Sequence, residues 1–71
     1  MTTPTLLREA GEALWGPLWQ TELSRALGVS DRTVRRWMAS ANEIPDGVRG
    51  ELQTLLRDRG KLLLHLIPRL G

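Results

Sequence analysis

The sequence contains no cysteine and a single histidine, His65. It therefore has no disulfide framework, and it lacks the ligand set that a structural zinc site needs. Disulfides and metals commonly stabilise domains of this size, so regular helix packing or association between chains has to contribute more here. The absence of cysteine also fits a reducing compartment, and we expect a cytoplasmic protein.

Long apolar runs and catalytic signatures are missing as well. No stretch reaches the roughly 20 apolar residues that cross a bilayer, so we expect no membrane partner. The sequence has no glycine-rich phosphate loop, no metal-ligand spacing and no paired acids suited to a cleft. Its single histidine lies far along the chain from Ser24, Ser30 and Ser40, which leaves a Ser-His-acid site unsupported. We expect neither an enzyme nor a cofactor, and no small-molecule ligand is evident.

Charge is modest in total and uneven in placement. Ten basic and eight acidic residues give 71 residues a formal net charge of +2. Nine of the ten basic residues are arginine, and three of them lie between positions 32 and 36. Arginine is suited to bidentate contacts with phosphate or guanine. The local cluster, rather than the total charge, favours a nucleic-acid partner.

Two helices are predicted in the first part of the chain. Apolar residues at helical spacing predict a helix over 4–15, with Thr3 as its N-cap. Gly16-Pro17 ends that helix, because the residue before proline avoids the helical region. A second helix is predicted over 19–27, and Gly28 fits the left-handed position just beyond it. Trp15 and Trp19 bracket the break, where filling the core is the expected role and base stacking the alternative.

A third helix is predicted over 31–40. Ser30 is a good N-cap for this helix, and Asp31 in the first turn complements the positive end of the helix dipole. When residues are placed at 100° intervals, the helix has two different sides. The inward side carries Val34, Trp37, Met38 and Ala41.

The outward side of this third helix carries the arginines. Arg32 and Arg36 lie one turn apart at its centre, with Arg35 on one flank and Thr33 on the other. Most charged helix faces are simply solvated. This one has no acid four residues away on the ridge to neutralise it, and Asp31 with Arg35 is the one possible pair. We therefore interpret Arg32, Arg35 and Arg36, named the arginine ridge from here on, as a binding surface.

The last third of the chain is predicted to form a helix over about 45–59, stopped by Gly60, followed by a separate apolar segment. That segment, 61–70, is too apolar for one small core to cover and is either a helix or a short extended segment. Pro68 is expected to shorten or bend it. Apolar surface of this kind usually marks an interface. The expected interface residues are Leu62, Leu63, Leu66, Ile67 and Leu70.

The stretch from Gln20 to Trp37 resembles the Cro/C1-type (XRE-like) helix-turn-helix of phage and bacterial repressors. The resemblance covers roughly residues 5 to 58. Two positions depart from the family pattern: Ser24 replaces the usual alanine in the close contact between the two helices, and Ser40 replaces a frequent glycine. The residues that carry the resemblance are Gln20, Gly28, Val29, Val34, Trp37 and the Ile44-Pro45 opening of the next helix.

The resemblance implies a set of DNA contacts. The third helix would enter the major groove, where arginine most readily reads guanine. The implied base contacts are Arg32, Arg36, Arg35 and Thr33. The implied phosphate contacts are Gln20, Ser30 and Asn42.

Together these features predict an all-α fold, with residues 1–71 as a single lambda-repressor-like domain of about five short helices. We expect a repressor or autoregulator of a bacterial cell or a phage-infected host, acting as a homodimer through 61–71. Its partner would be double-stranded DNA, as a roughly palindromic operator with half-sites about one turn, roughly 34 Å, apart. Two alternatives remain open: a DNA-binding module of phage or plasmid machinery, such as a terminase or recombinase accessory, and a protein-interaction module that uses the arginine ridge.

Overall fold

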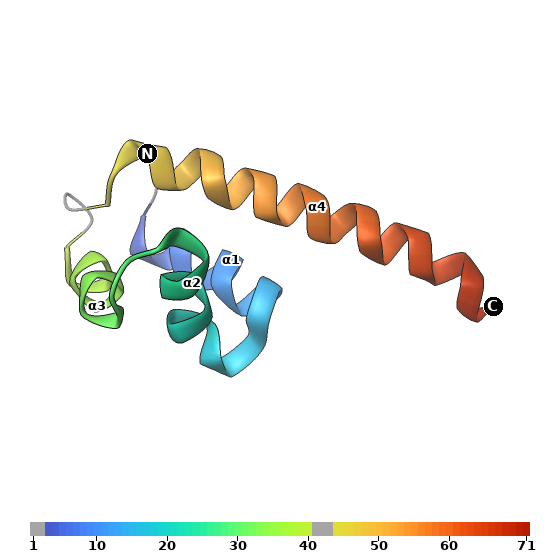
Figure 1. Ribbon diagram of the computed structural model, residues 1–71, viewed down its shortest axis with the longest axis horizontal. Helices are drawn as coiled ribbons and strands as arrows, with labels where there is room; N and C mark the ends of the chain where they lie inside the picture. Colours follow the sequence, from blue (N-terminus) through green and yellow to red (C-terminus); the bar gives the residue numbers. More distant parts are fainter. Residues whose placement is uncertain (1–2, 41–43) are drawn as a thin grey trace.

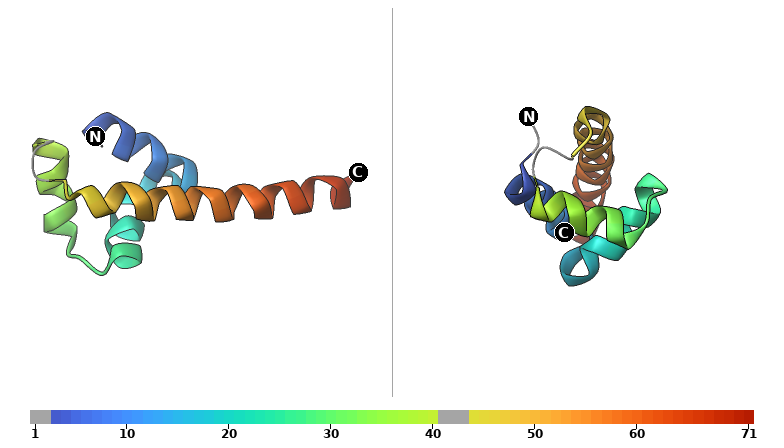
Figure 2. Two further views of the ribbon diagram at one scale, coloured as in Figure 1. Left: turned by 90° about the horizontal axis from the view of Figure 1, so that it is seen from above. Right: turned by 90° about the vertical axis from the view of Figure 1, so that its left-hand side faces the viewer.

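The computed structural model describes residues 3–40 and 44–71, which form helices and no strand. Figure 1 shows the first three helices packed as a body beside one half of the last helix, whose other half extends beyond them. Two perpendicular views show the same arrangement (Figure 2). The elements are α1 (Pro4–Trp15), a 3-10 turn η1 (Gly16–Leu18), α2 (Trp19–Leu27), α3 (Asp31–Ala39) and α4 (Asp46–Leu70).

The observed ends of α1 and α2 confirm the capping and helix-ending residues predicted from the sequence. Thr3 caps α1 by accepting a hydrogen bond from the Leu6 backbone N–H to its Oγ1 at 3.1 Å. Gly16, with φ of 75°, ends the helix in a conformation that favours glycine. Gly28 follows α2 in the left-handed region, with φ of 69° and ψ of 31°. Local chemistry alone therefore accounts for where these two helices end.

The hydrophobic core lies between the body and the first half of α4. Trp19 and Trp37 are each 5% exposed, so the core-filling role predicted for large rings is confirmed for both. A buried Trp19 ring is not available to stack on a base, while Trp15 is half-buried and packs against the core. The buried hydrophobic residues are Leu7, Leu14, Trp19, Leu23, Val34, Trp37, Ile44, Val48 and Leu52.

The predicted division of the last third into two elements is wrong. A single helix of 25 residues, α4, runs through Gly60 and reaches Leu70, so about five short helices become four α-helices and one 3-10 turn in the described chain. Gly60 does not adopt a positive φ, and its cost of about 1 kcal/mol relative to alanine is met by good helix formers on both sides. Pro68 was expected to shorten or bend the segment, but the helix continues past it to Leu70; its missing N–H leaves the Leu64 carbonyl without the usual intrahelical partner.

No helix in the described part of the chain combines the length and the apolar character that crossing a membrane requires.

Gly11 allows α1 and α2 to approach closely. It is buried in α1, and a Cβ built on it would lie 2.8 Å from Cδ2 of the Trp19 ring. We predict that Gly11→Ala lowers the free energy of unfolding by about 1–3 kcal/mol, because overpacking outweighs the better helix propensity of alanine. Denaturant unfolding followed by circular dichroism measures this change.

Gly50→Ala is the matched control, because a Cβ at exposed Gly50 in α4 meets nothing within 4 Å. This variant should gain about 0.5–1 kcal/mol from helix propensity. Equal stabilisation by both substitutions would contradict the close approach of α1 and α2.

Candidate nucleic-acid interface

The turn between α2 and α3 is tightly hydrogen-bonded. The Gly28 backbone N–H donates to the Arg25 carbonyl at 3.3 Å, and the Val29 N–H donates to the Ser24 carbonyl at 2.9 Å. These bonds satisfy carbonyls that the end of α2 would otherwise leave unpaired. Val29 is half-buried and packs against the core. The three-residue connection thus holds α2 and α3 at a defined crossing.

The first turn of α3 is closed by two hydroxyl side chains. Ser30 Oγ accepts a hydrogen bond from the Thr33 backbone N–H at 3.1 Å, as an N-cap should. The same oxygen lies 2.9 Å from Thr33 Oγ1 and is hydrogen-bonded to it. Ser30 is exposed and Thr33 is half-buried. The structure thus brings two of the sequence-predicted DNA contacts together at the positive end of the helix dipole.

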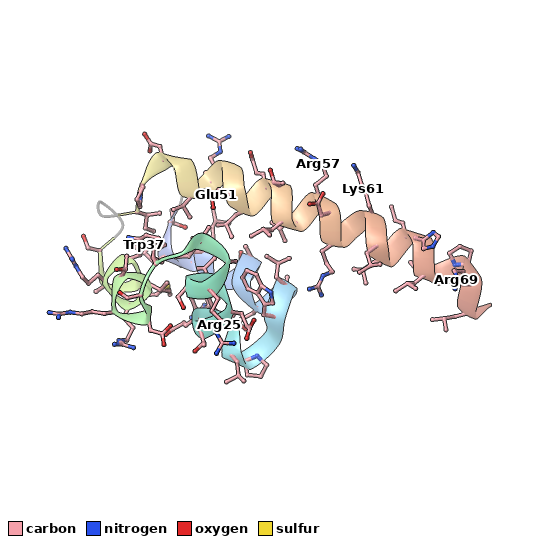
Figure 3. All side chains as sticks on the ribbon, viewed as in Figure 1. Arg25, Trp37, Glu51, Arg57, Lys61 and Arg69 are labelled. Atoms are coloured by element: carbon pink, nitrogen blue, oxygen red, sulfur yellow. The ribbon has the colours of Figure 1, made fainter. Side chains whose placement is uncertain are left out.

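The arginine ridge occupies the outer side of α3. Arg32, Arg35 and Arg36 are all exposed, whereas Val34 is 0% exposed and Trp37 faces the core. Figure 3 shows α3 at the end of the molecule remote from the C-terminus, with long side chains extending outward from it. The predicted division of α3 into inward and outward sides is therefore confirmed for these residues, whereas Ala41, predicted on the inward side, lies outside the described residues.

Asp31 is not an ion-pair partner of Arg35 in the described structure. Its carboxylate instead meets the side chain of Ser24 on α2, where Ser24 Oγ lies 2.6 Å from Asp31 Oδ1. Among the described residues, no acid lies within ion-pair distance of Arg32 or Arg35. The positive potential of these two side chains is therefore not locally neutralised, which suits a polyanionic partner.

Ser24 connects α2 to α3, a role that the sequence did not reveal. It is 4% exposed, and its hydroxyl can donate its one proton either to the Thr21 carbonyl at 2.7 Å or to Asp31 at 2.6 Å. From the sequence, Ser24 was expected only to be small enough to fit the contact between the helices. The seven-residue separation from Asp31 spans a turn, so no helical periodicity could have paired them.

Two predicted phosphate contacts lie outside α3. Gln20 is half-buried in the first turn of α2, which directly follows the 3-10 turn η1, where the Trp19 backbone N–H donates to the Gly16 carbonyl. Asn42 lies outside the residues that the structure describes.

One hollow of the described surface, of about 280 Å³, lies between α2 and α4. It is lined by Ala26, Gly50, Glu51, Thr54 and Leu55. Within the described residues, no three His, Cys, Asp or Glu side chains come together as a possible metal site.

Comparison with known proteins adds no identification: no family model matches the chain, and neither a curated protein nor a solved structure matches it.

The link between Ser24 and Asp31 can be measured by a double-mutant cycle. We predict that Ser24→Ala and Asp31→Ala are coupled by about 0.5–1.5 kcal/mol in the free energy of unfolding, the usual net value of one hydrogen bond. The cycle cancels the separate effect of Asp31 on the helix dipole. Denaturant titrations of the two single variants and the double variant supply the measurement, and additive losses would show that the contact contributes nothing.

Proposed function

We propose that this protein is a sequence-specific regulator that binds duplex DNA by inserting α3 into the major groove. The observation that carries the proposal is the arginine ridge, exposed on one side of α3 while Val34 and Trp37 anchor the other side in the core. A rigid, well-anchored helix that presents arginines outward is the arrangement that helix-turn-helix readers use.

The dimensions of α3 suit a groove. Its nine residues make it about 13 Å long, and an α-helix with its side chains is about 10–12 Å across, which fits a major groove about 12 Å wide. Arg32 and Arg36, one turn apart on the outer side, would contact guanine O6 and N7. Arg35 and Thr33 would reach bases at the edges of this contact. The site therefore favours recognition sequences that contain G·C pairs.

Phosphate contacts would orient the helix on the duplex. Ser30 and the backbone N–H groups at the start of α3 face outward at the positive end of a helix dipole, which favours a phosphate. Gln20 would make the equivalent contact from the start of α2. Such contacts set the docking angle but carry no sequence information, which remains with the arginine ridge.

Specific regulation would require more than one copy of α3 on the DNA. A single α3 contacts too few base pairs for tight and specific binding, and a two-fold dimer brings two copies to the DNA. The exposed side chains of 61–70 are the natural contact for a second chain, since Leu62, Leu63 and Ile67 are each more than half exposed. We infer a homodimeric repressor or autoregulator that binds two copies of one short sequence.

The central test uses Arg32→Ala and Arg36→Ala against a sequence selected from random duplex DNA. Loss of a base contact should weaken binding to the selected sequence by about 1–3 kcal/mol and binding to random DNA much less. Fluorescence anisotropy at fixed salt measures both affinities. Equal losses on both DNAs would make these residues phosphate contacts and contradict base reading.

Arg57→Ala is the matched control, because Arg57 is an exposed arginine on α4, distant from α3 (Figure 3). It should leave discrimination between the two DNAs unchanged. If the unmodified protein shows no affinity for duplex DNA even at low salt, the proposal fails and the arginine ridge is a surface for an acidic protein.

A further inference from the structure

The projecting half of α4 leaves a continuous apolar surface uncovered. Beyond Leu55, which packs against the core, every residue from Lys61 onward is exposed. The exposed fractions include 52% for Leu63, 64% for Ile67 and 90% for Leu70. Figure 1 shows no other element beside this half of the helix. Monomeric proteins rarely leave apolar residues together in this way.

The apolar residues follow the spacing of a helix-pairing seam. Four leucines and one arginine of α4 recur at alternating intervals of three and four residues, which places all five on one side of the helix. From here on, the α4 seam means Leu56, Arg59, Leu63, Leu66 and Leu70. Leu62 and Ile67 widen the same side, while Leu64 lies about 100° away from its centre.

The α4 seam continues the stripe that α4 buries in the body. Val48 and Leu52 lie on the same side of the helix as Leu63 and Leu66, and both are buried in the core, where α4 packs mainly against α1. The body thus covers this side in part as far as Arg59, which is half-buried, and leaves it open from Lys61 onward. If a second α4 packed parallel against the exposed half of this helix, its first half would occupy the space that α1 to α3 already fill. If it packed antiparallel, its first half would lie beyond Leu70, where there is no such overlap.

Arg59 also favours antiparallel over parallel pairing of two α4 helices. It is the one charged residue of the α4 seam and is half-buried at the point where the body ends. In a parallel pair in register, the two Arg59 side chains would meet at one level, and burying like charges together is costly. In an antiparallel pair centred on Leu63, they lie on opposite sides of the centre of the contact, about 12 Å apart along the axis. Each then faces Ile67 of a second chain and can extend its guanidinium to water.

We propose that the α4 seam binds a second copy of this chain in antiparallel orientation. The inference rests on the proposed function for its consequence at DNA, although the pairing itself does not require DNA. The contact is about 22 Å long, so it buries less than the roughly 800 Å² per partner of a standard interface. We therefore expect a reversible dimer, formed at micromolar concentrations, rather than an obligate one.

Antiparallel pairing separates the two DNA-binding ends. With the two-fold axis at Leu63, the two Asp46 positions lie about 50 Å apart along the helices, and α3 lies at the same end as Asp46 (Figure 2). This exceeds the one-turn spacing of about 34 Å that the sequence led us to expect. The two arginine ridges also point in opposite directions. The dimer would therefore hold together two DNA segments, rather than read adjacent half-sites on one.

Orientation can be measured without DNA. The chain has no cysteine, so Arg49→Cys provides a unique spin-label site on exposed surface near the start of α4. Electron–electron resonance at about 100 μM protein should give a label separation of about 40 Å for the antiparallel pair, from 14 residues on each side of Leu63. A label at Arg69→Cys, which is exposed and off the α4 seam, should give about 20 Å. Short distances from the Arg49 and Arg69 labels alike would indicate a parallel dimer and overturn the proposal.

Charged variants of α4 test both the pairing through the α4 seam and the proposed binding of two DNA segments by one dimer. Leu63→Glu with Leu66→Glu should give a helical monomer by sedimentation and circular dichroism, whereas Leu64→Glu, off the seam on the same helix, should remain a dimer.

The unmodified protein should pull a second labelled duplex onto an immobilised selected sequence, and the double variant should bind one duplex only. A dimer that survives the double change, or an unmodified protein that is monomeric at 100 μM, overturns the proposal.

The two proposals fail in different ways. If Arg32→Ala discriminates normally between DNAs, the proposed reading of bases fails while the α4 distances stand. If the selected DNA contains two half-sites one turn apart on a single duplex and no second duplex is captured, the antiparallel arrangement fails while DNA reading by α3 stands.

Discussion

The packing of α2 against α3 is the constraint on which the rest of the structure depends. Ser24 is buried in that contact, and its hydroxyl lies between the Thr21 carbonyl and the Asp31 carboxylate. Gly28 reverses the chain in the left-handed region that other residues adopt only with strain. Because this crossing is set locally, Val34 and Trp37 enter the core together. The opposite side of α3 is thereby turned outward, with its arginines.

The molecule leaves two very different surfaces uncovered, and they lie at opposite ends (Figure 1). At one end, α3 presents charge that no acid of the described chain neutralises at Arg32 or Arg35. At the other, α4 presents leucines that the small body cannot reach. A body of three short helices can cover only about half of a 25-residue helix. The small core of a domain of this size therefore leaves the apolar residues of the second half of α4 exposed.

Much of the fold followed from local chemistry. Caps and breakers at Thr3, Gly16, Gly28 and Ser30 act within a few residues, so the ends of α1, α2 and the start of α3 could be placed from the sequence. The division of α3 into two sides could also be predicted, since it needs only the period of a helix. Gly60 shows the limit of this reasoning. A glycine ends a helix only if the chain turns there, and nothing in the body requires a turn at that point.

The sequence by itself determined the two helices on either side of Gly28, the outward arginines and the apolar character of the last ten residues, because each depends on residues that are neighbours in the chain or one turn apart. Only the tertiary structure decided that Ser24 meets Asp31, that Gly11 admits the Trp19 ring, and that the leucines of α4 continue the buried stripe beyond the body. These depend on how separate helices cross. The angle at which two helices cross is set by packing between their side chains, and the periodicity of one helix carries no information about it.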